Sequence, residues 1–284
     1  MKFGLYGLHK GSSIEPETLA RRARLAEVAG FESLWVGDHV ALPSDAPDVA
    51  EEPRLELVVV LAHLAAVTSR VRLASGVAIL PTRQPVLLAK QLASIDVLSN
   101  GRLIVGIGVG YVELEMNALG ASIADRGART DEYMTAMRAL WDEPAPTFEG
   151  AFVSFSGLIE RPRPVQRPYP PIIVGGHSPA AYRRAATTAN GWYGWQLDPD
   201  ETIAALTSLR EAADRYGRPA ELGDLEISIT PPYTFDVDMA RRYADAGVHR
   251  LVVQPQSSSG TAMDELIDTL ASDYIDKVWR SPGR

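Results

Sequence analysis

The chain contains no cysteine among its 284 residues. This absence excludes disulfide bonds and thiolate metal sites, and it favours an intracellular protein. The sequence also lacks an apolar run of the ~18 residues that a membrane helix needs. Met1 and Lys2 lead directly into an apolar segment at residues 3 to 6, which leaves no room for a signal peptide. These absences predict a soluble, cytoplasmic protein.

The sequence also argues against a metal centre, a serine hydrolase site, and nucleic acid or a membrane as the main partner. No His-x-x-x-His or His-Glu pair occurs, so we expect no metal centre. No G-x-S-x-G elbow occurs, which argues against a Ser-His-Asp hydrolase. The net charge of -8 argues against nucleic acid or an anionic membrane as the main partner. A small molecule is the expected partner.

What the sequence does contain is a regular alternation of short apolar strands with helical segments. The predicted strands lie at residues 3 to 6, 32 to 36, 71 to 80, 103 to 108, 171 to 175, 191 to 195, 225 to 230 and 249 to 253. The predicted helices lie at residues 16 to 29, 54 to 68, 85 to 99, 129 to 142, 178 to 189, 199 to 216, 236 to 246 and 261 to 279. Alternation of this kind predicts an α/β fold, a (β/α)8 TIM barrel formed by one domain over residues 1–284.

One segment breaks the regular spacing. Residues 143 to 170 contain too many prolines for a helix and an alternating stretch at their centre. We interpret the segment as an excursion between the fourth helix and the fifth strand, with a short hairpin around residues 148 to 155. A long ordered loop is the alternative.

A run of glycines ends the fourth predicted strand. Gly106, Gly108 and Gly110 resemble half of a dinucleotide fingerprint, but no glycine closes the G-x-G-x-x-G pattern. Each glycine lets the backbone approach a flat ring or another strand without a Cβ between them. Tight strand packing alone explains the run about as well.

The active site of a TIM barrel forms at the carboxyl ends of its strands. A histidine is therefore a candidate site residue if it follows a predicted strand. His39 and His9 follow the second and first strands, and His177 follows the fifth. His249 opens the last strand and belongs to the opposite face, whereas His63 lies within a helix.

Asp38 and His39 are the best acid/base candidates, because they place a carboxylate and an imidazole directly after a buried strand. The alternative is that Asp38 caps a turn and His39 only packs. Glu113 and Glu115 could form a paired-carboxylate site, although a place in the first turn of a helix suits Glu115 better.

The fifth strand leads into a candidate phosphate site. Gly175, Gly176 and His177 precede Ser178, which opens a helix, so free N–H groups, the helix dipole and a hydroxyl converge there. A short loop in which Ser178 is only a helix cap is the alternative.

Taken together, several segments resemble the bacterial luciferase-like monooxygenase superfamily, and within it the branch that uses the deazaflavin coenzyme F420. The matching segments are GFESLWVGDHV (residues 30 to 40), SGVAILPTRQPVLLAKQLASIDVLSNGRLIVGIGVGY (75 to 111), the R-x-x-E-Y-x-x-x-x-R-x-L-W pattern from Arg129 to Trp141, and PPIIVGGHSPAAYRRAA (170 to 186). They cover most of residues 1 to 195. A homodimer is expected from this resemblance.

The resemblance implies a role for each matching residue. Gly76 and Val77 would form a bulge with a non-prolyl cis peptide that backs the central ring of the coenzyme. Asp38 would contact the pyrimidine side of the ring, and His39 would transfer the proton near the reacting carbon. The remaining cofactor residues are Gly108 and Gly110, next to the ring and its side chain, and Gly175, Gly176 and His177, at the phosphate.

One position departs from the family pattern. Some sugar-phosphate dehydrogenases of this family have a glutamate after the glycines, where this chain has Tyr111, and no set of lysines is available for a substrate phosphate. The predicted substrate pocket therefore suits a neutral, moderately hydrophobic molecule. It comprises His9, Leu42, Arg83, Tyr111, Trp195, Gln196, Pro231 and Gln254.

Three functions remain open at this point. The first is hydride transfer between coenzyme F420 and an organic substrate, with His39 as proton donor or acceptor. The second is a monooxygenase that uses reduced FMN and oxygen. The third is a flavin- or deazaflavin-binding protein without turnover.

Overall fold

The computed structural model describes residues 1–45, 51–233, 236–257 and 260–275. Its strands are β1 (Lys2–Tyr6), β2 (Ser33–Val36), β3 (Arg72–Ser75), β4 (Ala78–Ile79), β5 (Leu103–Gly108), β6 (Phe148–Glu149), β7 (Ser154–Phe155), β8 (Ile172–Gly175), β9 (Gly191–Trp195), β10 (Glu226–Thr230) and β11 (Arg250–Val253). Its α-helices are α1 (Pro16–Ala29), α3 (Leu57–Val67), α4 (Pro85–Leu98), α5 (Glu113–Ala118), α6 (Arg126–Asp142), α7 (Pro179–Thr188), α8 (Pro199–Tyr216), α9 (Val237–Asp245) and α10 (Ala262–Leu270). Short 3-10 helices lie at Gly11–Ser13, Leu80–Thr82 and Ala220–Leu222, and a π-helical turn lies at Ala271–Ile275.

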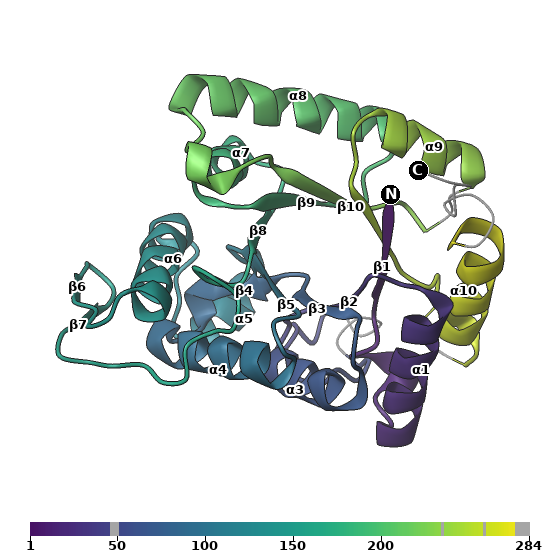
Figure 1. Ribbon diagram of the computed structural model, residues 1–284, viewed down its shortest axis with the longest axis horizontal. Helices are drawn as coiled ribbons and strands as arrows, with labels where there is room; N and C mark the ends of the chain where they lie inside the picture. Colours follow the sequence, from purple (N-terminus) through teal and green to yellow (C-terminus); the bar gives the residue numbers. More distant parts are fainter. Residues whose placement is uncertain (46–50, 234–235, 258–259, 276–284) are drawn as a thin grey trace.

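The strands form a closed parallel barrel with helices around it (Figure 1). Their order is β3-β2-β1-β11-β10-β9-β8-β5, and β5 pairs with β3 to close the ring. In this register Leu5 lies opposite both Leu34 and Val253, and Leu73 lies opposite Leu103. The predicted (β/α)8 TIM barrel is confirmed.

The helix boundaries follow local signals in the sequence. Helices α1 and α8 begin and end where predicted, because each has a proline in its first turn and a glycine directly after its end. The Ser178 side chain accepts a hydrogen bond from the N–H of Ala181 at 3.2 Å and caps α7. The predicted hairpin forms from β6 and β7, which pair antiparallel beside α6 (Figure 1).

Three elements differ from the prediction. The predicted strand at residues 71 to 80 is divided into β3 and β4 at the Gly76-Val77 peptide, which is cis. There the Ser75 hydroxyl donates to the carbonyl of Gly106 at 2.7 Å and accepts from its N–H at 2.8 Å, where β3 and β5 separate. Helix α5 is absent from the predicted helix ranges, although the predicted place of Glu115 in the first turn of a helix is confirmed. The last helix ends at Leu270 and continues only as the π-helical turn, and residues 276 to 279 of that prediction lie outside the described residues.

Side chains fill the barrel and close its amino-terminal end. Trp35, Ile104, Ile173 and Tyr193 are among the buried residues of the interior cluster. Below them Arg250, fully buried at the start of β11, lies 5.7 Å from the Trp35 ring centroid.

The Arg250 guanidinium binds two carboxylates at this closed end. Its Nε is 2.7 Å from Glu32, and its Nη2 is 2.7 Å from Glu226. Because the interior is packed, a ligand has to bind at the opposite, carboxyl end of the strands.

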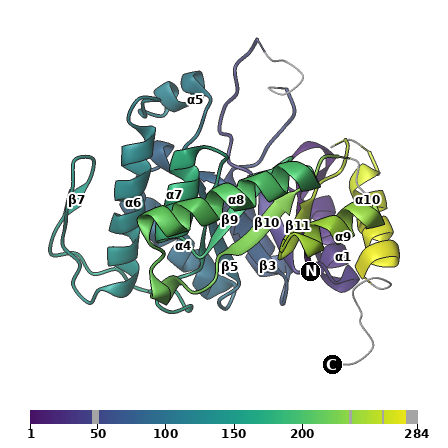
Figure 2. The same cartoon turned by 90° about the horizontal axis from the view of Figure 1, so that it is seen from above.

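That carboxyl end is built up by two segments. Figure 2 shows α5 and the described parts of the segment between β2 and α3 rising from the same end of the barrel. Among the described residues, no helix is long and apolar enough to cross a membrane.

Candidate active site

A cavity of about 450 Å³ opens at the carboxyl ends of the strands. Ligand sites in proteins commonly have volumes of about 300 to 1,000 Å³. The residues that line the cavity lie within the strands of the barrel or in the segments that follow them in the chain. They are Tyr6, His9, Lys10, Gly37, Asp38, His39, Leu42, Arg54, Gly76, Val77, Ile79, Gly110, Tyr111, Gly175, Gly176, His177, Tyr193, Trp195, Tyr233 and Gln254.

One side of the cavity is formed by the bulge between β3 and β4. The Val77 side chain packs over the neighbouring strands, so that a Cβ on Gly108 would lie 2.5 Å from Val77 Cγ2 and a Cβ on Gly175 would lie 3.1 Å from Val77 Cγ1. Gly108 is therefore required for strand packing and does not line the cavity. Gly110, with a φ of +77°, does line it.

His39 is held by a carboxylate from another part of the barrel. Its Nδ1 lies 2.8 Å from Oε2 of Glu115, which lies in the first turn of α5. The other carboxylate oxygen, Oε1, accepts the N–H groups of Val40 at 2.6 Å and Ala41 at 3.1 Å. The Glu115 side chain is 1 % exposed, so a buried carboxylate holds residues 39 to 41 in place.

The charge of Glu115 determines which ring nitrogen of His39 carries the proton. Burial alone would raise the pKa of Glu115, but the hydrogen bonds from His39 and the two backbone N–H groups hold that pKa below its ordinary value. The ionised carboxylate can only accept, so Nδ1 of a neutral His39 carries the proton. The Nε2 atom is then left as an acceptor.

Tyr111 is the residue that contacts this acceptor. Its hydroxyl lies 3.3 Å from Nε2 of His39, and the two rings meet edge to face. Since the Tyr111 side chain is 75 % exposed, a ligand hydroxyl can replace it without disturbing the core.

Asp38 does not contact His39 but supports β4. Its Oδ2 accepts the N–H of Ile79 and the Nε–H of Arg83, each at 2.8 Å, and its Oδ1 pairs with Nη2 of Arg83. Arg83 also pairs with Glu56 at 2.8 Å. Asp38 lines the cavity, whereas Arg83 does not.

Some of the remaining predicted residues line the cavity and others do not. His9, Leu42, Tyr111, Trp195 and Gln254 line the cavity. Besides Arg83 and Gly108, three predicted residues lie outside the lining, namely Gln196, Pro231 and Ser178. Gln196 is exposed with a φ of +52°, a conformation that directs the chain away from β9.

The loop from Gly175 to Ser178 presents donors to the cavity. Nε2 of His177 accepts the N–H of Trp195 at 3.0 Å, and burial lowers the pKa of His177, so the neutral ring carries its proton on Nδ1. The backbone N–H groups of His177 and Ser178 donate to no atom of the described chain. These groups can bind an anion such as a phosphate.

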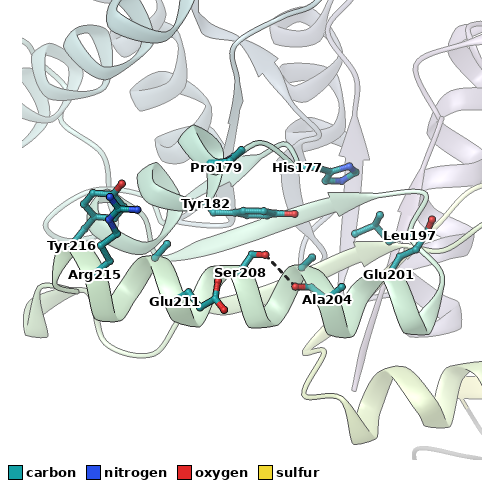
Figure 3. A pocket seen from close by; sticks show the side chains of 12 residues that line it. His177, Pro179, Tyr182, Leu197, Glu201, Ala204, Ser208, Glu211, Arg215 and Tyr216 are labelled. Carbon is teal, nitrogen blue, oxygen red and sulfur yellow. Dashed lines mark hydrogen bonds between the residues drawn. The ribbon is translucent and has the colours of Figure 1, made fainter.

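A second hollow, the α7–α8 groove, lies on the outer layer of helices (Figure 3). It has a volume of about 530 Å³ and touches the cavity only through His177. Tyr182 lies along its floor, and Glu201, Glu211 and Arg215 line it. The groove lies away from His39, so we place the chemistry in the cavity.

The strand-end rule located His39 but not its partner Glu115, which is 76 residues away in the chain. Applied to β5, the same rule places Glu115 at the same mouth. Among the described residues, no three metal-ligand side chains are grouped to hold a metal ion.

Comparison with known proteins gives consistent results. The family model described as luciferase-like monooxygenase matches residues 1–279. An uncharacterised protein of Mycobacterium tuberculosis is 32 % identical over 282 residues, covering 94 % of this chain and 97 % of that protein. An FMNH2-dependent dimethylsulfone monooxygenase of Pseudomonas putida is 33 % identical over 173 residues, which cover 59 % of this chain and 47 % of that enzyme.

Among solved structures, the coenzyme F420 dependent tetrahydromethanopterin reductase of Methanopyrus kandleri superposes with a TM-score of 0.78 at 18 % identity. The match covers 96 % of this chain and 97 % of the reductase. At this identity the likeness concerns the fold.

Proposed function

The chain belongs to the luciferase-like monooxygenase family, and from this premise we propose that it transfers a hydride between coenzyme F420 and a small, neutral, moderately hydrophobic organic substrate. His39 gives or takes the accompanying proton. The observation that carries this proposal is the contact between His39 and Glu115, which leaves Nε2 as a proton acceptor inside the cavity.

The residues present fit a coenzyme with a flat ring and a phosphate. The Gly76-Val77 bulge and Gly110 offer backbone to a ring without a side chain in the way. At the other side of the cavity the N–H groups of His177 and Ser178, with Nδ1–H of His177, offer donors to a phosphate. When bound, the deazaflavin takes up or delivers the hydride.

The chain's own residues handle the proton. In the oxidising direction, the carbinol carbon of an alcohol loses a hydride, its hydroxyl loses a proton to Nε2 of His39, and a carbonyl forms. Glu115 stays ionised and stabilises the imidazolium that results. In the reducing direction the same imidazolium returns the proton to the substrate.

The runner-up is a monooxygenase that uses reduced FMN and oxygen. It is favoured by the sequence similarity to the Pseudomonas putida enzyme, and the same bulge and donors would suit FMN. Parallel titrations with F420 and FMN, followed by tryptophan fluorescence, separate the two proposals, because Trp195 lines the cavity. Saturable quenching by F420 at micromolar concentration, with FMN much weaker, is the expected result. Preference for FMN would favour the runner-up, and binding of neither coenzyme would overturn both.

A further inference from the structure

Three polar side chains line one side of the cavity at the ends of two neighbouring strands. Leu5 of β1 lies opposite Val253 of β11, so Tyr6 and Gln254 come side by side as these strands end. His9 follows three residues after Tyr6, with their ring centroids 5.3 Å apart. His9 is 3 % exposed and Gln254 is 7 % exposed.

Two of the three side chains have a buried nitrogen without a hydrogen-bond partner among the described residues. These atoms are Nδ1 of His9 and Nε2 of Gln254. The Tyr6 hydroxyl is not one of these buried atoms, but it faces the same space at Gly37 as Nε2 of His9. Most buried polar side-chain atoms in proteins are hydrogen-bonded, so two unpaired buried nitrogens in one cavity wall point to a ligand.

All three side chains are neutral near pH 7. Burial, together with the nearby charges of Lys10 and Arg54, lowers the pKa of His9 to about 3. Burial raises the pKa of Tyr6 above its ordinary value. The two cations at the rim bind Glu52, with Lys10 at 3.3 Å and Arg54 at 2.6 Å. The wall therefore offers hydrogen bonds without formal charge.

The space beside these groups is preformed and bounded by an aromatic ring. The Trp195 ring meets the Tyr6 ring edge to face at 5.0 Å. A Cβ added to Gly37 would collide with the Tyr6 hydroxyl and lie 3.0 Å from Nε2 of His9. Glycine at this position thus keeps open the space on which the two polar atoms converge.

We propose that Tyr6, His9 and Gln254 form a subsite that binds a neutral carbonyl group, of a ketone, ester or amide, on a substrate with a flat apolar body. The phenol and the carboxamide donate to the carbonyl oxygen, and the imidazole accepts from a neighbouring N–H or O–H or donates to the oxygen. This subsite deepens the proposed function, on which its identification as a substrate site rests.

The test compares three probes that share a benzene ring and differ in charge, namely benzamide, benzoate and benzylamine. Binding to the full-length protein is measured by ligand-observed NMR, which requires no turnover. We expect benzamide to bind at least about 10-fold more tightly than either ion, because a site with polar groups discriminates by those groups. Equal binding of the three probes would overturn the proposal.

Substitutions then locate the binding. Tyr6→Phe and Gln254→Leu should each weaken benzamide binding about 10-fold, the usual cost of leaving a buried polar group unpaired. The matched controls are Tyr182→Phe, in the α7–α8 groove, and Gln256→Leu, on the exposed surface, which should have no effect. Gly37→Ala fills the space while keeping every polar group, and it too should weaken binding. Unchanged affinity in the first two variants would rule out the subsite.

Titration with F420 separates this inference from the proposed function. Loss of F420 affinity in Tyr6→Phe or Gln254→Leu would assign the wall to the coenzyme and overturn the subsite. If the wild-type protein prefers benzamide over the two ions but does not bind F420, the proposed function fails and the subsite stands as a ligand site. If F420 binds and the probes do not discriminate, the subsite alone fails.

Discussion

Nδ1 of His39 lies 2.8 Å from Oε2 of Glu115, and the same carboxylate accepts the N–H groups of the two residues that follow His39. One buried side chain thus fixes both the position of the loop and the tautomer of the imidazole. The orientation of a catalytic histidine commonly depends on such a partner. Glu115 acts through His39 and is a positioning residue.

Replacing Glu115 with glutamine tests this role. The amide keeps the shape but lacks the charge that stabilises the imidazolium, so we expect kcat to fall about 100-fold or more, as general acid–base catalysis is lost. F420 affinity, measured by fluorescence titration, should stay within about 3-fold of the wild-type value, because the substitution keeps the shape of the side chain and Glu115 does not line the cavity. The control is Glu113→Gln, an exposed carboxylate in the same helical turn. An unchanged kcat and pH profile in Glu115→Gln would exclude the role.

His39→Ala distinguishes an enzyme from a protein that only binds the coenzyme. We expect turnover to fall about 100-fold or more while F420 still binds, because the proton acceptor is removed and the bulge is untouched. His63→Ala, in α3 and away from the cavity, is the matched control. Once a substrate is in hand, full activity in His39→Ala would refute the assignment of His39.

Gly108→Ala tests the packing of the bulge. The added methyl would meet Val77 Cγ2 at 2.5 Å, so Val77 has to move into the cavity or the strands have to separate. We expect F420 affinity to fall by about 10-fold or more, since overpacking of this kind commonly costs 1–3 kcal/mol. Gly127→Ala is the control, because its methyl would have no neighbour nearer than 3.8 Å. Tight F420 binding by a folded Gly108→Ala protein would show that the bulge does not support the coenzyme.

Arg83→Leu should destabilise the fold. The Asp38 side chain is 2 % exposed and would be left without its partner, which in buried pairs costs about 3–5 kcal/mol. Urea unfolding measures the loss, and a second substitution, Asp38→Asn, should restore part of it. Arg241→Leu removes an exposed pair with Asp238 and should change stability by less than about 1 kcal/mol. Equal effects of the two arginine variants would contradict the structure.

The lowered pKa of Glu27 should make the free energy of unfolding depend on pH. Burial opposes its ionisation, but the N–H groups of Val71, Arg70 and Ser69 hold its pKa at about 2, against 4.5 for the ordinary side chain. The folded state therefore gains stability from this carboxylate above pH 4.5 and loses it as the pH falls towards about 2.

The measurement compares the urea midpoints of wild type and Glu27→Gln at several pH values. Their difference should be largest at neutral pH and should shrink on acidification. Glu149→Gln, in the exposed β6 strand, serves as the control. A difference that does not change with pH would show that the carboxylate charge is not involved.

The sequence predicted the barrel well because its signals are local. Pro16, Pro199 and Gly217 mark helix ends within a few residues of themselves, so no distant contact is needed to place α1 and α8. The bulge after β3 was foreseen only through the family resemblance. Its exchange of hydrogen bonds between Ser75 and Gly106 joins segments that are 31 residues apart.

The site was predictable to the level of strand ends and no further. That rule brought His9, His39 and His177 to one mouth, but it could not say that Arg83 would pair with Asp38. Pairing across the barrel depends on the direction of each side chain. For the same reason the link between Glu115 and His39 was missed.

The closed amino-terminal end of the barrel, where buried Arg250 pairs with Glu32 and Glu226, has a kinetic consequence. Because this end is closed, ligands can enter and leave the barrel only through the opening at the carboxyl ends of the strands. The inner of two ligands must bind first and dissociate last. Two ligands stacked in this cavity would therefore bind and leave in a compulsory order. If the outer ligand dissociates slowly, the inner ligand cannot dissociate until the outer one has left.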